Sequence, residues 1–197
     1  MNYKIDYKLM GISWILLIAY LILFFSGNLS ALDKVGYQTI SSLTSESMTG
    51  IMIAVTFLGS WISVVIICII CVIIRFKKGL FISLNVSVIW ILNYILKNII
   101  ERPRPSVTRL VVETGFSFPS AHAMVSFGLF ALIFYMLKDK YKTIAILIMI
   151  IPVFISITRV YLGVHYTSDV IGGCLMAFTY LCTVIPILKY HKLLPHT

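Results

Sequence analysis

Six apolar stretches separated by short polar segments dominate the pattern along the chain. A helix rises about 1.5 Å per residue, so about 20 apolar residues cross a hydrocarbon core of about 30 Å. The pattern therefore predicts an all-α integral membrane protein, with residues 1–197 forming a single transmembrane domain. Its six predicted spans are residues 9–25, 50–74, 80–96, 120–137, 143–158 and 170–188.

The first apolar stretch follows Lys4 and Lys8, an arrangement that a secretory signal peptide also has. We interpret it as the first spanning helix, because the run is long enough to cross a bilayer.

The segment after this stretch, residues 26–49, is polar but contains apolar residues at near-helical spacing. These residues are Leu32, Val35, Ile40 and Leu43. The spacing predicts a short amphipathic helix on the membrane surface. Such a helix either forms a wall or lid of a lipid entry groove or simply connects two spans.

The composition agrees with a membrane protein, since 60% of the residues are hydrophobic and only 12% are charged. The mean hydropathy of +1.01 lies far outside the range of soluble domains. A formal net charge of +9 raises nucleic acid as a partner. No basic, aromatic-interleaved soluble segment is present, so we expect these charges to face lipid headgroups instead.

The four cysteines all lie in apolar stretches, and Cys68 and Cys71 form a CxxC pair. Their neighbours are isoleucine and valine, without a histidine or carboxylate that could complete a metal site. We interpret them as small buried hydrophobic residues.

The basic residues predict the orientation of the chain. Six spans place both termini on one side, together with most of the basic residues: Lys4, Lys8, Arg75, Lys77, Lys78, Lys138, Lys140, Lys142, Lys189 and Lys192. By the positive-inside rule this side is cytoplasmic. The protein is therefore expected to be a multi-pass protein of the cell (plasma) membrane.

Three polar segments carry the candidate chemistry, all within residues 97–169. They read KNIIERPRP (97–105), FPSAH (118–122) and TRVYLGVHYTSD (158–169). With six spans, the loops after the third and the fifth span emerge on the same side of the membrane. The hydropathy pattern therefore predicts one site at the outer membrane surface.

Cations and helix amides in these segments could hold a phosphate. Lys97, Arg104 and Arg159 supply positive charge around it. Ser120 opens a predicted helix, so its hydroxyl and the free N–H groups of Ala121 and His122 form an anion site.

The two histidines could carry out the transfer. His165 is the candidate nucleophile, because a neutral imidazole can attack phosphorus when its other ring nitrogen is held. Asp169 follows it by four residues, which on a helix places the carboxylate on the same face. His122 can protonate the leaving oxygen and then activate water. We expect no cofactor and no metal, because the cations already neutralise the phosphate and no acidic cluster is present.

Together the three segments resemble the type 2 phosphatidic acid phosphatase superfamily, whose pattern is K-x6-RP, PSGH and SR-x5-H-x3-D. The chain matches at Lys97 to Pro105, at Pro119 to His122 and at Thr158 to Asp169, with alanine for glycine at 121 and threonine for serine at 158. The resemblance implies a phosphohistidine on His165, acid–base work by His122 and support from Asp169. It also implies phosphate binding by Lys97, Arg104, Ser120, Ala121, His122 and Arg159.

A membrane lipid phosphatase is accordingly the leading hypothesis, with a lipid phosphate or diphosphate as substrate. The outward-facing site favours undecaprenyl diphosphate, and phosphatidylglycerophosphate or phosphatidic acid is the alternative. A phosphotransferase with the same residues would pass the phosphoryl group to an alcohol, and the sequence leaves that alternative open. An ion-coupled transporter would need ionisable residues at mid-membrane depth, and the spans contain almost none.

Overall fold

The computed structural model describes residues 7–191 and 193–194, and within them every regular element is a helix. The helices are α1 (Tyr7–Phe25), α2 (Ser30–Ser41), α3 (Glu46–Phe57), α4 (Trp61–Ile74), α5 (Phe76–Ile100), α6 (Ala121–Leu137), α7 (Lys142–Ile148), α8 (Ile150–Tyr161) and α9 (Thr167–Tyr190). The prediction of an all-α fold is confirmed for this part of the chain.

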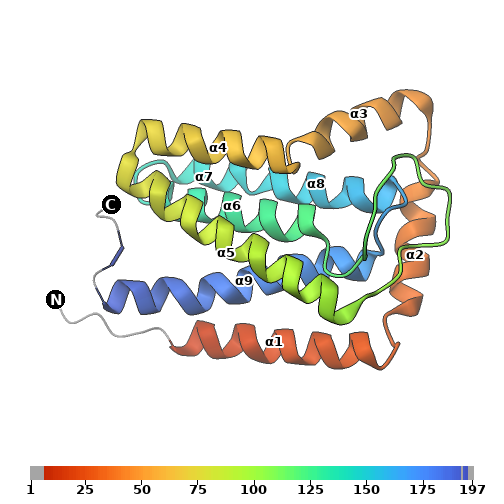
Figure 1. Cartoon of the computed structure of the whole chain (residues 1–197), viewed down its shortest axis with the longest axis horizontal. Coiled ribbons are helices and arrows are strands. Elements are labelled where there is room, and N and C mark those ends of the chain that lie inside the picture. The colour runs from red at the N-terminus through yellow and green to blue at the C-terminus, as the bar shows by residue number, and fades with distance from the viewer. Residues whose placement is uncertain (1–6, 192, 195–197) are drawn as a thin grey trace.

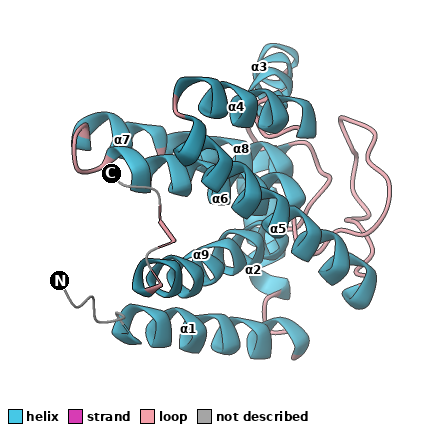
Figure 2. Cartoon of the chain, turned by 60° about the vertical axis from the view of Figure 1, so that its left-hand side comes forward, coloured by secondary structure: helices cyan, strands magenta, loops and turns pink. Residues whose placement is uncertain are grey.

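The long helices run side by side between two ends of the molecule, and α2 lies across one of these ends (Figure 1). The start of α1 and the end of α9 lie together at the other end. Seen after a 60° turn, the loop of residues 101–120 between α5 and α6 projects at the end that carries α2 (Figure 2). Three loops therefore meet near α2, following α1, α5 and α8.

Helix α6 forms the centre of the bundle and packs against α5, α8 and α9. It is apolar around its circumference, as a helix surrounded by other helices must be. Its Leu129 and Leu132 are fully buried, and Gly128 lets α5 approach closely. A β-carbon at Gly128 would lie 2.4 Å from Ile89 Cδ1. This central position fixes the first turn of α6, and with it Ala121 and His122.

Four helical segments are long and apolar enough to cross a membrane: α1, α5, the α7–α8 pair and α9. Residues 50–74, expected to form one span, lie in α3 and α4, which meet at an angle of 45°. If this bent pair crosses the membrane as one unit, it forms a fifth span. The angle arises where the helix is interrupted and restarted, because Ser60 caps α4 by accepting a bond from the Ser63 amide. Helix α6 is apolar but has only 17 residues. Six crossings therefore stay a prediction.

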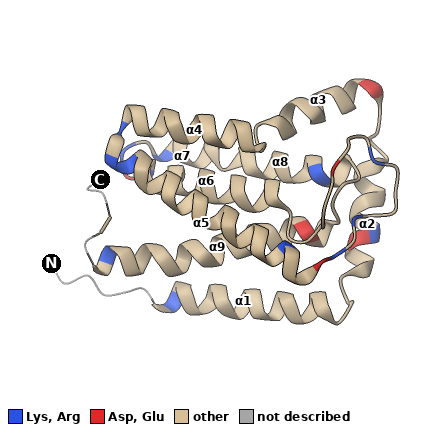
Figure 3. Ribbon diagram, in the orientation of Figure 1, with Lys and Arg blue, Asp and Glu red and all other residues tan. Residues whose placement is uncertain are grey.

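Charged residues concentrate at the two ends of the helix bundle, and few lie along its middle (Figure 3). The end with the start of α1 and the end of α9 carries mainly lysine and arginine, whereas the end with α2 carries both signs. An apolar band between two charged ends is what a bilayer requires.

Candidate active site

The three polar segments of the sequence meet at the end of the bundle that carries α2. Five of the predicted site residues line one cavity of about 380 Å³: Lys97, Arg104, Ala121, His122 and His165. The other three are buried around it. Asp169 contacts His165, Arg159 contacts the cavity-lining Glu113, and Ser120 is the N-cap of α6.

His165 lies in the short loop between α8 and α9 and is only 3% exposed. Its Nδ1 is 3.4 Å from Asp169 Oδ2, and its Nε2 is 3.4 Å from an Arg104 nitrogen. Burial lowers the pKa of His165 to about 4, although the Asp169 carboxylate acts in the opposite direction. The ring is therefore neutral at pH 7. With the proton on Nδ1 facing Asp169, the lone pair of Nε2 is available for attack.

Asp169 is fully buried in the first turn of α9. Its Oδ2 also accepts the Tyr166 backbone N–H at 2.8 Å, which caps the start of α9. The helix start and the orientation of the carboxylate toward His165 are thus fixed by the same atom.

Arg104 ties the two loops of the site together. Its guanidinium donates to the carbonyls of Thr114 at 2.8 Å, Gly115 at 3.1 Å and Val164 at 2.9 Å. Bonds to three carbonyls hold the arginine beside the His165 ring. These bonds do not neutralise the charge of Arg104, because backbone carbonyls are uncharged acceptors.

Arg159, at the end of α8, is 1% exposed and donates to Thr56 Oγ1 at 2.8 Å. It also forms an ion pair with Glu113, whose other carboxylate oxygen is 3.8 Å from Arg104. A carboxylate therefore lies between two of the three predicted phosphate-binding cations. Nothing in the sequence pattern singled out Glu113, because it is a lone acidic residue in a loop.

Two polar atoms beside the cavity lack hydrogen-bond partners. In the described part of the chain, Ser120 Oγ and Arg159 Nε are two of three buried side-chain atoms without one, and Thr167 Oγ1 is the third. Buried donors are normally satisfied, so unpaired donors next to a cationic cavity indicate a place for an anion.

Lys97 reaches the cavity from the last turn of α5. Its Nζ donates to the Phe116 carbonyl at 2.6 Å and lies 3.4 Å from that of Ser117. These carbonyls position the ammonium at the rim and leave a further N–H for a ligand.

His122, in the first turn of α6, borders the same cavity as His165. A β-carbon at Gly59, in the break between α3 and α4, would lie 3.2 Å from His122 Cδ2. The break thus brings α3 and α4 close against the ring of this histidine.

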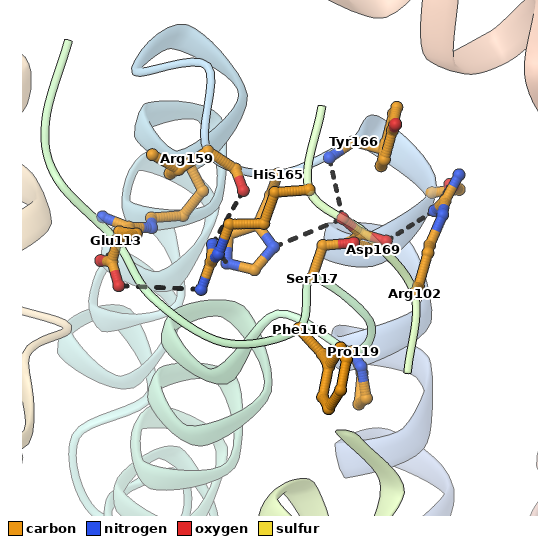
Figure 4. A network of polar contacts seen from close by, with 12 residues as sticks. Arg102, Glu113, Phe116, Ser117, Pro119, Arg159, His165, Tyr166 and Asp169 are labelled. Atoms are coloured by element: carbon orange, nitrogen blue, oxygen red, sulfur yellow. Dashed lines mark hydrogen bonds and ion pairs between the residues drawn. The ribbon is translucent and has the colours of Figure 1, made fainter. Parts of the chain in front are cut away.

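A polar network behind the histidine involves residues that the sequence did not mark as site residues. Figure 4 shows Asp169 between the His165 ring on one side and the Arg102 guanidinium on the other. Arg102 bonds to Asp169 Oδ1 at 2.6 Å and to Asp33 of α2 at 2.8 Å. Asp33 and Arg102 are 69 residues apart, so no local spacing could have paired them.

Within residues 7–191 and 193–194, no group of three or more His, Cys, Asp or Glu side chains is placed to hold a metal ion. The four cysteines are free thiols among these helices. Of the histidines outside the site, His191 is exposed at the end of α9, and His196 lies outside the described residues.

A sequence profile of the PAP2 superfamily matches residues 76–192. The chain is 44% identical over 91 residues to phosphatidylglycerophosphatase B of Bacillus subtilis, covering 42% of this chain and 44% of that protein. It is 37% identical over 62 residues to lipid A 4'-phosphatase of Bacteroides thetaiotaomicron, covering 32% of this chain and 27% of that protein. In these alignments the chain spans less than half the length of either curated relative.

The fold is also similar to that of a solved protein. The crystal structure of a transmembrane PAP2-type phosphatidylglycerolphosphate phosphatase from Bacillus subtilis superimposes with a TM-score of 0.82 at 24% sequence identity. The match covers 95% of this chain and 98% of that chain. The likeness shows that the two chains share the whole helical architecture.

Proposed function

The chain belongs to the PAP2 superfamily, and on this premise we propose that it is a membrane lipid phosphatase working through a phosphohistidine. The observation that carries the proposal is the environment of His165. A buried neutral imidazole has Asp169 at one ring nitrogen and a cation at the other, inside a cavity bordered by a second histidine.

The substrate phosphate enters the cavity and accepts hydrogen bonds from the unpaired donors, Ser120 Oγ and Arg159 Nε. Arg104, Arg159 and Lys97 neutralise its charge, and Ser120 Oγ with the amides of the first turn of α6 binds its oxygens. Because Glu113 already pairs with both arginines, the phosphate competes with this carboxylate for them.

His165 Nε2 then attacks phosphorus, and the bond to the lipid oxygen breaks. His122 gives its proton to that oxygen, while Asp169 stabilises the positive charge developing on the imidazole. In the second half, His122 takes a proton from water, whose oxygen displaces the imidazole and releases inorganic phosphate. The cycle returns both histidines to their starting states and calls for no metal or other cofactor.

A groove beside the cavity supports a lipid substrate. A second cavity of about 300 Å³ runs between α4 and α5 and shares Val64 and Trp90 with the active-site cavity. Its other lining residues are mostly apolar: Val65, Cys68, Ile69, Val72, Ile73, Ser83, Val86 and Ser87. A lipid tail fits such a groove with its phosphate at His165.

For the substrate itself we propose undecaprenyl diphosphate, on the argument that six crossings and cytoplasmic termini put the site on the outer surface. Phosphatidylglycerophosphate is the second candidate, because a relative that is 44% identical over the matched region is named a phosphatidylglycerophosphatase. Phosphatidic acid would use the same residues, as would transfer to an alcohol in place of water.

The test is a panel of these lipids presented to the purified protein in detergent micelles with excess chelator. We expect release of inorganic phosphate from at least one lipid, and none from His165→Ala. A new phosphorylated lipid without inorganic phosphate would identify a phosphotransferase. Absence of turnover on the whole panel, or equal turnover by His165→Ala, would overturn the proposal.

A further inference from the structure

The Arg102 guanidinium lies between two buried carboxylates that belong to different helices. One nitrogen is 2.6 Å from Asp169 Oδ1 in α9, and another is 2.8 Å from Asp33 Oδ2 in α2. We propose that Arg102 and Asp33 are positioning residues that hold the Asp169 carboxylate against His165, which makes α2 part of the active site. The inference rests on the proposed function, because His165 is taken as the nucleophile.

Asp33 is itself rigidly held. It lies in the first turn of α2 and is only 7% exposed. Its Oδ1 accepts the Ser168 backbone N–H at 2.7 Å, and its Oδ2 accepts the Ser168 hydroxyl at 2.8 Å. The first N–H groups of a helix have no acceptor within that helix. Asp33 of α2 provides the acceptor for one such N–H group of α9, that of Ser168. The starts of α2 and α9 are thereby joined at one carboxylate.

The two oxygens of Asp169 have separate partners. Oδ2 faces His165 Nδ1 and the Tyr166 amide, whereas Oδ1 accepts from Arg102. The 3.4 Å separation from His165 is long for a hydrogen bond, so that contact alone holds the carboxylate weakly. The short charged bond to Arg102 opposes rotation of the carboxylate away from the ring.

Two aromatic rings pack against the Arg102 guanidinium and restrict its position. The Arg102 Cζ is 3.9 Å from the centroid of the Tyr166 ring and 5.0 Å from that of Phe24. Tyr166 directly follows His165, so the arginine is anchored to the same turn as the nucleophile. Arg104 has a different position, since it contacts loop carbonyls, Glu113 and His165 rather than Asp169.

Charge balance makes the arrangement sensitive to Arg102. One guanidinium serves two buried carboxylates, and its removal leaves both without their cation. Asp169 would then turn toward other donors or take up a proton, and in either case His165 loses its acceptor. Neither Arg102 nor Asp33 lines the active-site cavity of about 380 Å³, although both line a neighbouring cavity of about 580 Å³ that also reaches His165. We therefore expect their removal to lower kcat more than it changes KM.

The test compares Arg102→Gln, Arg102→Lys and Asp33→Asn in the wild-type and Asp169→Asn backgrounds, with exposed Arg75→Gln as the control. Initial rates of phosphate release from the most active lipid of the panel give kcat and KM per folded molecule. We expect Arg102→Gln to lower kcat at least about tenfold while KM stays within about threefold. Arg102→Lys keeps the charge but lacks the two separate nitrogens that reach Asp169 and Asp33, so its kcat should lie between those of wild type and Arg102→Gln.

In the Asp169→Asn background the same substitutions should change kcat by less than about threefold, because they act through Asp169. The rates there need a high enzyme concentration, since loss of such an aspartate lowers kcat by about 10⁴ in serine proteases. Equal losses in both backgrounds, or a wild-type kcat for Arg102→Gln, would overturn the inference. If Arg102→Gln does not fold, Asp33→Asn decides by the same criteria.

A second measurement does not depend on turnover. In protein labelled with ¹⁵N-histidine, the His165 signals, assigned with His165→Ala, report which ring nitrogen carries the proton. We expect the Nδ1–H tautomer in the wild type and a mixture in Arg102→Gln. An unchanged tautomer in Arg102→Gln refutes the positioning role, whereas a wild type inactive on all lipids refutes only the proposed function.

Discussion

Gly59 leaves no room for a side chain beside His122, and this makes one substitution especially informative. A β-carbon at Gly59 would lie 2.6 Å from Ile155 Cγ2 and 3.2 Å from His122 Cδ2. Ordinary contacts begin at 3.4 Å, so the atoms must separate by 3.4 Å less 2.6 Å, or at least 0.8 Å. Ile155 is fully buried in α8 and cannot turn into solvent. Gly59→Ala should therefore shift the α3–α4 break, the histidine, or both.

The expected effect is on proton transfer. A displacement of about 1 Å in a reacting group costs about 10²-fold in rate, so we predict that kcat for a lipid substrate falls about tenfold to a hundredfold. Overpacking should also lower the free energy of unfolding by about 1–3 kcal/mol.

The assay measures phosphate release by wild type, Gly59→Ala and Gly50→Ala, all purified in the same detergent. Gly50 is the matched control, because a β-carbon there has no atom within 4 Å. Each variant is also tested on p-nitrophenyl phosphate, whose leaving group needs little protonation. In the first turnover, which does not need His122 as a base, Gly59→Ala should lose much less activity on this ester than on the lipid. A wild-type kcat for Gly59→Ala, or equal losses on both substrates, would refute the placement of His122 as the proton donor.

Three further predictions concern the other parts of the site. Asp169→Asn should lower kcat by about 10⁴, as in serine proteases, and should also lower the thermal stability measured by tryptophan fluorescence, because the buried ion pair with Arg102 is broken. A loss of kcat below tenfold in the folded protein would contradict its role. Because burial depresses the pKa of His165 to about 4, the neutral nucleophile is retained as pH falls and is lost only on passing pH 4. The acid limb of kcat/KM, corrected for ionisation of the substrate phosphate, should therefore lie near pH 4, and a limb near pH 6.5 would contradict it. Orthovanadate should inhibit competitively and excess chelator should leave kcat unchanged; a strict requirement for Mg²⁺ would show that the cations of the chain do not suffice.

The location of the site could be predicted from the sequence because it depends on alternation of apolar spans. Placing residues 97–105 and 158–169 at one end of the bundle needs only the direction in which successive helices run. The contact between His165 and Asp169 was also predicted, but for a different reason than the structure gives. The prediction placed both residues on one helix face, whereas His165 lies in the loop before α9, which begins at Thr167.

The residues that contact the site residues could not be predicted from the sequence. Asp33 reaches Arg102 only because α2 lies across the end of the bundle, and Glu113 lies between two arginines because of the path of loop 101–120. Both depend on tertiary packing between segments without a regular pattern. The bend between α3 and α4 was missed for a related reason, because the apolar run continues through Gly59 and Ser60 almost without interruption.

The central claim is that a phosphoryl group is carried on His165. It is tested most directly by mixing His122→Ala with ³²P-labelled p-nitrophenyl phosphate, whose leaving group needs little protonation, quenching in alkaline detergent and locating the label by mass spectrometry. The account predicts label on His165 that accumulates because hydrolysis of the intermediate lacks its base. Label on any other residue, or lipid turnover by wild-type protein without any labelled histidine, would contradict it.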